Sequence, residues 1–141
     1  MTATPVLRTI GAIVAAVATV LVLLIAVELF SAIAHPTPPG FGGTQEEMCA
    51  HVANYPNWAL AAAVPMWGAT ALVGVWIAGR LGNRGSAIFI AVLLLAALAF
   101  NLWMLPYPPW FKIVQPIAVL IGIACGYRWS RRRGNELEER G

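Results

Sequence analysis

The chain has 141 residues, of which 60% are hydrophobic and only 11% are charged. Soluble domains carry about 25% charged residues, so this composition excludes an ordinary soluble protein and predicts an integral membrane protein. Each crossing of a bilayer takes about 20 apolar residues, which leaves room for one helical bundle and for no separate soluble domain. The net charge of +3 is explained by where the arginines lie, and we predict no nucleic-acid partner.

The first apolar segment predicts a membrane span over about residues 9–34. It carries no charge apart from Glu28. Proline cannot continue a helix, so the span is expected to end at Pro36, Pro38 and Pro39.

A short polar connector follows the first span. Thr44 and Glu47 have the spacing of a capping box, in which each side chain accepts a hydrogen bond from the backbone of the other residue. This pattern predicts a short helix over about 45–53, and we expect it to rest at the outer membrane interface.

Three further apolar runs predict spans two to four at about 58–79, 86–105 and 110–129. The remaining residues, 130–141, are rich in Arg and Glu and form the predicted cytoplasmic tail. The predicted fold is therefore all-α: a four-transmembrane-helix bundle, with the short helix in its first outer connector, that makes a single domain over 1–141.

Basic residues are strongly biased toward one side of the predicted bundle. Eight of them fall on the side that holds both termini, namely Arg8, Arg80, Arg84, Arg128, Arg131, Arg132, Arg133 and Arg140. Only Lys112 falls on the other side. Because cytoplasmic loops carry the excess of Lys and Arg, we predict a multi-pass protein of a bacterial-type inner (plasma) membrane with both termini in the cytoplasm.

Small residues recur at helical spacing in the fourth span. Ala118, Gly122 and Gly126 form a ridge that allows close approach of another helix. Four short spans rarely enclose a whole transport pathway, so we expect a homo-oligomer or a subunit of a larger membrane complex. The ridge is the predicted contact face.

Polar side chains gather at a similar depth near the outer ends of the spans. Glu28 lies about 12 Å below the end of the first span at 1.5 Å per residue, and His35 follows on nearly the same helix face. Asn101 and Gln115 each lie five residues from the proline-rich connector between spans three and four. An ionisable group at this depth is costly unless it is paired or neutral. We therefore predict a binding or proton-carrying site from these four residues, with Lys112 as a possible partner charge.

A purely structural interpretation competes with this site. Glu28 is then neutral, or it is paired with Lys112 or His35. Asn101 and Gln115 then only join neighbouring helices by hydrogen bonds, which contribute about 0.6–2 kcal/mol each.

The first connector also contains side chains that bind metals. His35, Met48, Cys49 and His51 are ligand types that suit copper or zinc. Their spacing matches neither CxxC nor HExxH, so they are weak candidates and the sequence indicates no particular cofactor.

Three stretches, Val27-Glu28, His35 to Gly40 and Asn101 to Phe111, resemble the pattern of small uncharacterised bacterial four-span integral membrane proteins. The resemblance covers most of the chain. It implies the four-span fold and a bacterial membrane, but no activity, cofactor or catalytic residue.

Enzyme motifs are missing from the sequence. There is no nucleophile elbow, no phosphate-binding loop and no Asp anywhere in the chain. The first interpretation is a non-catalytic membrane protein that binds a partner helix, a lipid or a small apolar molecule, as an accessory subunit of a membrane complex. One alternative is a small oligomeric proton-coupled transporter that uses Glu28. Another is a metal-dependent or redox enzyme at the outer connector.

Overall fold

The computed structural model describes residues 3–139, and for residue 3 and residues 133–138 it describes the backbone only. Within this range the chain forms no strand and five helices: α1 (Ala3–Ala34), α2 (Gln45–Ala53), α3 (Asn57–Leu81), α4 (Arg84–Met104) and α5 (Pro109–Glu139). All but α2 are long and apolar enough to cross a membrane. The prediction of an all-α bundle with four candidate spans and one short helix is confirmed.

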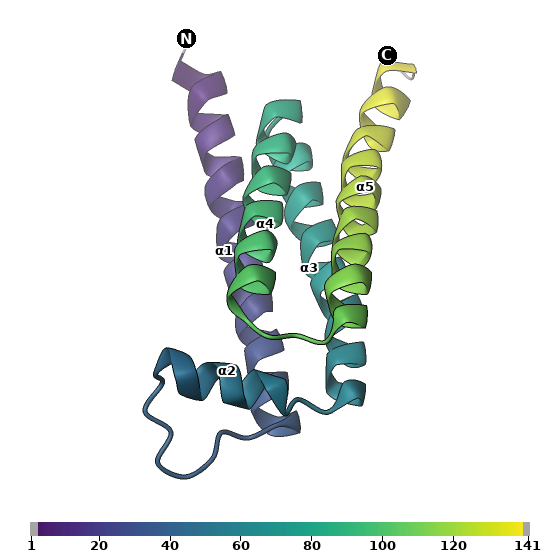
Figure 1. The fold of residues 1–141 in the computed structure, drawn as a ribbon. Helices are drawn as coiled ribbons and strands as arrows, with labels where there is room; N and C mark the ends of the chain where they lie inside the picture. The colour runs from purple at the N-terminus through teal and green to yellow at the C-terminus, as the bar shows by residue number, and fades with distance from the viewer. Residues whose placement is uncertain (1–2, 140–141) are drawn as a thin grey trace.

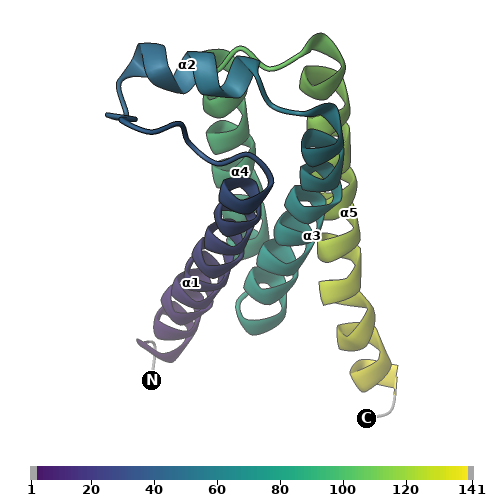
Figure 2. The same cartoon turned by 90° about the horizontal axis from the view of Figure 1, so that it is seen from below.

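The four long helices lie side by side, with α3 in contact with each of the other three (Figure 1). Its most extensive contact is with α5, whereas α4 touches α1 and α5 only sparsely. The short helix α2 lies across the end of the bundle that is opposite the two termini (Figure 2). The bundle therefore has an end covered by α2 and an end that carries the termini.

Two helices extend beyond the predicted spans. α1 begins before the predicted start at residue 9, because Pro5 lies in the first turn, where the backbone N–H groups have no helical partner to lose. α5 continues to Glu139, so the described part of the predicted tail 130–141 is helical. The tail contains no proline to stop the helix. Residues 140–141 lie outside the described range.

The connector between α1 and α2 turns at glycines. Gly40 and Gly43 have φ values of 80° and 76°, which side chains with a Cβ rarely adopt. Thr44 then caps α2: its hydroxyl accepts from the Glu47 N–H at 3.2 Å, and the Glu47 carboxylate accepts from the Thr44 N–H at 3.1 Å. The predicted capping box is confirmed. The bond from the Thr44 backbone holds the pKa of Glu47 below its ordinary value.

The core lies where α1, α4 and α5 meet α3. It is built from small and branched apolar side chains: Ala16, Val20, Ala71, Val75, Ala78, Ala87, Ile90, Leu94, Leu98 and Val119. Alanines at these positions let the helix backbones approach closely. The larger apolar side chains on the outer faces of α1 and α4, such as Val22 and Trp103, are exposed, as expected where lipid is the solvent.

The small-residue ridge of α5 packs inside the chain, against α3. Gly122 and Gly126 are buried. A Cβ on Gly122 would overlap the carbonyl of Gly68, and a Cβ on Gly126 would overlap the carbonyl of Leu72. Ala118 also lies against Gly68. The predicted contact of this ridge with another subunit is therefore corrected, because α3 of the same chain already occupies that face.

Candidate functional site

A cavity of about 330 Å³ lies at the end of the bundle that α2 covers. We call it the capped cavity. Its lining consists of Val27, Glu28, Ser31, Ala32, His35, Thr37, Met48, His51, Val52, Tyr55, Leu60, Ala63, Trp67, Asn101, Leu105, Tyr107 and Phe111. Three predicted site residues, Glu28, His35 and Asn101, thus share one cavity although they come from α1, the connector after it and α4.

The other two predicted site residues lie elsewhere. Gln115 is 1% exposed, and neither atom of its amide has a hydrogen-bond partner among the described residues. It lies one helical turn beyond Phe111, which lines the capped cavity. Lys112 is exposed and is not a lining residue. The structure therefore does not bring Gln115 and Lys112 together with the other three.

Glu28 lines the capped cavity with an accessible side chain. In the part of the chain that the structure describes, it forms no ion pair with His35 or Lys112. The interpretation of Glu28 as one partner of such a pair is therefore not supported. Its proton-carrying role stays a prediction.

The connector after α1 is joined to α2 by two histidines. The rings of His35 and His51 stack with their centroids 4.3 Å apart, and Nε2 of His35 lies 3.1 Å from the His51 carbonyl oxygen. Because a carbonyl only accepts, Nε2 of His35 carries a proton and donates it. Burial, and next the charge of His35, lowers the pKa of His51, which favours its neutral form. The Tyr55 ring contacts both histidines.

The predicted metal ligands are only partly brought together. His35, Met48 and His51 line the capped cavity, whereas Cys49 does not, and its thiol lies 4.0 Å from the Met104 carbonyl. Nε2 of His35 is already engaged by a backbone oxygen. Among the described residues, no three His, Cys, Asp or Glu side chains form a group that could hold a metal ion.

Tyr107 projects into the capped cavity from the connector between α4 and α5. Its burial, followed by the nearby acidic groups of Tyr55 and Glu28, raises its pKa to about 12, and a hydrogen bond with Asn101 acts in the opposite direction. The phenol therefore keeps its proton at any physiological pH and is available as a hydrogen-bond donor. Its ring lies 4.8 Å from that of Phe111.

Sequence reasoning missed the aromatic part of this cavity. Tyr55 and Tyr107 each lie next to a proline in a connector at the end of the bundle that α2 covers, where Tyr is also expected as an interface anchor. The one available signal for Tyr55 was its place one helical turn after His51. Trp67 of α3 gave no signal, because nothing in an apolar run tells which face turns toward a cavity.

The resemblance to small bacterial membrane proteins implies four membrane spans. The structure has four helices that are long and apolar enough to span a membrane, and it supports the resemblance only to that extent. No protein-family model, curated protein or solved structure matches the chain.

Proposed function

We propose that this chain is a non-catalytic integral membrane protein that binds a small amphipathic molecule in the capped cavity. The observation that carries the proposal is the mixed lining of that cavity. Glu28, Asn101 and Tyr107 supply polar groups, and Trp67 and Phe111 supply apolar area. A volume of about 330 Å³ is within the range of ligand sites, in which a few polar groups converge on a mostly apolar wall.

Binding of a small molecule is favoured over binding of a partner helix. The ridge that was expected to receive such a helix is filled by α3, since Gly122 and Gly126 are already buried against it. An oligomer or a larger membrane complex stays a prediction, now without its predicted contact face.

Filling the capped cavity tests this function. Ala32 is an exposed residue of α1 that lines the cavity, and Ala26 is an exposed residue of the same helix that does not. We expect Ala32→Phe to weaken binding of the neutral amphipathic probe 2-phenyl-2-propanol about tenfold, because an overfilled site costs roughly 1–3 kcal/mol. Ala26→Phe is the matched control and should bind as the wild type does.

Equilibrium dialysis of the probe against detergent-solubilised protein measures this difference. Both variants add the same side chain to the same helix, so nonspecific uptake of the probe cancels between them. Equal binding by Ala32→Phe and Ala26→Phe would show that the capped cavity is not the site.

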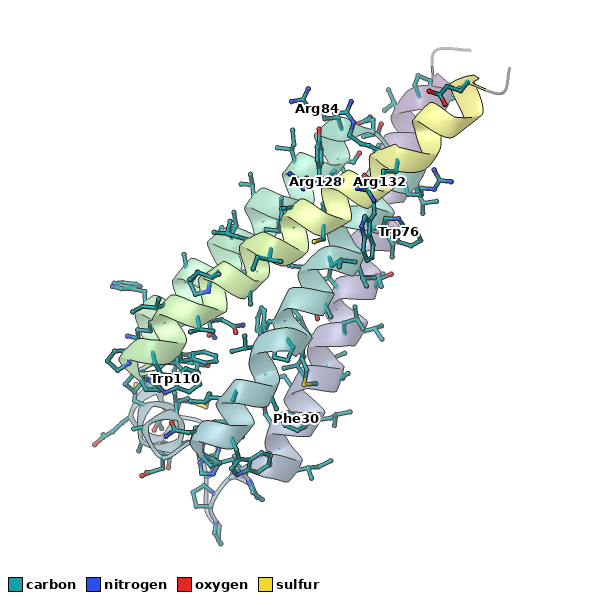
Figure 3. All side chains as sticks on the ribbon, turned by 90° about the vertical axis from the view of Figure 1, so that its right-hand side faces the viewer. Phe30, Trp76, Arg84, Trp110, Arg128 and Arg132 are labelled. Atoms are coloured by element: carbon teal, nitrogen blue, oxygen red, sulfur yellow. The ribbon has the colours of Figure 1, made fainter. Side chains whose placement is uncertain are left out.

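We further propose that the protein lies in a bacterial-type inner membrane with both termini in the cytoplasm. Arg84, Arg128 and Arg132 lie toward the end that carries the termini, and Trp110 lies near the opposite end (Figure 3). This arrangement supports the orientation because basic residues gather on the cytoplasmic side. Arg140 lies outside the described residues, as does the side chain of Arg133.

Cysteine labelling tests the orientation. In a background that lacks Cys49 and Cys125, the variants Glu46→Cys and Glu139→Cys each place one thiol at an exposed position, at opposite ends of the bundle. An impermeant maleimide added to intact cells should label position 46 and leave position 139 unlabelled until the cells are opened. The reverse pattern would invert the proposed topology.

A further inference from the structure

The capped cavity contains an acidic group without a basic partner. Glu28 is the only acidic residue in the four candidate membrane spans. A carboxylate at such a depth is costly unless a charge compensates it or it takes up a proton. Within the described residues, no Lys or Arg lines the cavity and no ion pair engages Glu28. No Lys or Arg side chain of the lining therefore supplies the compensating charge.

The rest of the lining is suited to a positive charge that is attached to an apolar body. Tyr55, Trp67, Tyr107 and Phe111 place four aromatic rings around the cavity. The faces of aromatic rings carry partial negative charge and attract organic cations, most strongly when water is excluded. Rings and carboxylate together therefore favour the same sign of charge in the ligand.

The histidines do not reverse this preference. His35 donates its Nε2 proton to the backbone carbonyl of His51, so this N–H does not point to a ligand. Burial lowers the pKa of His51, which keeps that ring uncharged at neutral pH. The remaining polar groups, which include Ser31 and Asn101, are neutral and can accept hydrogen bonds from an ammonium group.

We infer that the molecule bound in the capped cavity is an amphipathic organic cation, an amine or quaternary ammonium compound, with Glu28 as its counter-ion and the aromatic rings around its charged group. This inference rests on the proposed function and names its ligand class. An organic anion is disfavoured because it would approach Glu28 without any basic side chain in the lining to compensate it. A bare metal ion is disfavoured because a single carboxylate and a partly engaged histidine pair offer too few ligands.

The test compares two probes of nearly the same shape. Phenyltrimethylammonium carries a positive charge, and 2-phenyl-2-propanol carries none. We expect the wild-type protein to bind the cation about tenfold more tightly than the alcohol, since a carboxylate and aromatic faces act only on the charged probe. Glu28→Gln should abolish that preference, so that this variant binds the two probes with equal affinity. Glu46→Gln, at an exposed position of α2 outside the cavity, is the matched control and should keep the preference.

The outcomes separate the two proposals. If neither probe shows binding that Ala32→Phe reduces, the proposed function fails. If both probes bind in the capped cavity with equal affinity to the wild-type protein, the cavity stands as a binding site and the inferred cation is wrong. The wild-type comparison decides this point even if Glu28→Gln does not fold. A cation preference that persists in a folded Glu28→Gln protein would also overturn the role given to Glu28.

Discussion

Gly122→Ala is expected to destabilise the bundle by about 1–3 kcal/mol, which is the usual cost of overpacking a well-packed interior. The added Cβ would overlap the carbonyl of Gly68, and a backbone group cannot rotate away as a side chain can. Alanine normally stabilises a helix by about 1 kcal/mol relative to glycine, and the expected net loss of stability is what remains after this gain is subtracted. Gly126→Ala should behave in the same way, since its Cβ would overlap the carbonyl of Leu72.

Gly11→Ala is the matched control for this prediction. A Cβ on Gly11 of α1 meets nothing within 4 Å, so the same substitution should be neutral or slightly stabilising. Thermal unfolding in detergent, followed by circular dichroism, measures all three variants. If Gly122→Ala and Gly11→Ala have the same melting temperature, the close contact between α3 and α5 does not exist.

Substitutions at Gln115 are expected to move stability in opposite directions. The side chain is fully buried, and neither amide atom has a partner among the described residues. Gln115→Met keeps a similar shape and removes the unpaired polar group, so it should stabilise the bundle by about 1–3 kcal/mol. Gln115→Glu should destabilise it by about 3–5 kcal/mol at neutral pH, because it leaves a buried charge uncompensated.

Gln45, the only other glutamine, provides the control. It is exposed on α2, and its amide nitrogen donates one long hydrogen bond, 3.4 Å, to the Met104 carbonyl oxygen. Gln45→Met and Gln45→Glu should therefore each cost no more than about 1 kcal/mol. Melting temperatures of the four variants in one detergent make the comparison. A loss of stability in Gln115→Met would mean that the Gln115 amide is hydrogen-bonded in the folded protein, and it would contradict the absence of a partner for that amide.

Counting residues along helices predicts one part of the candidate site well. It places Glu28 and Asn101 at a similar depth and His35 on the same helix face as Glu28, and these residues line the capped cavity. The same count fails for Gln115, because depth along a helix does not tell where two neighbours close on each other. Near that level α3 and α5 approach too tightly for a cavity, with Gly68 against Ala118.

Local chemistry is the most predictable part of the fold. Thr44 and Glu47 alone fix the start of α2, because both halves of a capping box lie within one helical turn. Long-range choices are not encoded in this local way. The spacing of Gly122 and Gly126 predicts close helix packing, but it does not tell whether the neighbouring helix belongs to the same chain. Tyr55 and Tyr107 line the same cavity only because two connectors that are distant in the sequence lie at the same end of the bundle.

The central place of α3 has a consequence for how the protein is made. Synthesis proceeds from the N-terminus, so α3 is complete before α5 leaves the ribosome. Until then the face of α3 around Gly68 and Leu72 has none of the close backbone contact that α5 provides. A chain cut short before Pro109 therefore leaves this narrow face open to lipid, or to any other helix with small residues that shares the membrane.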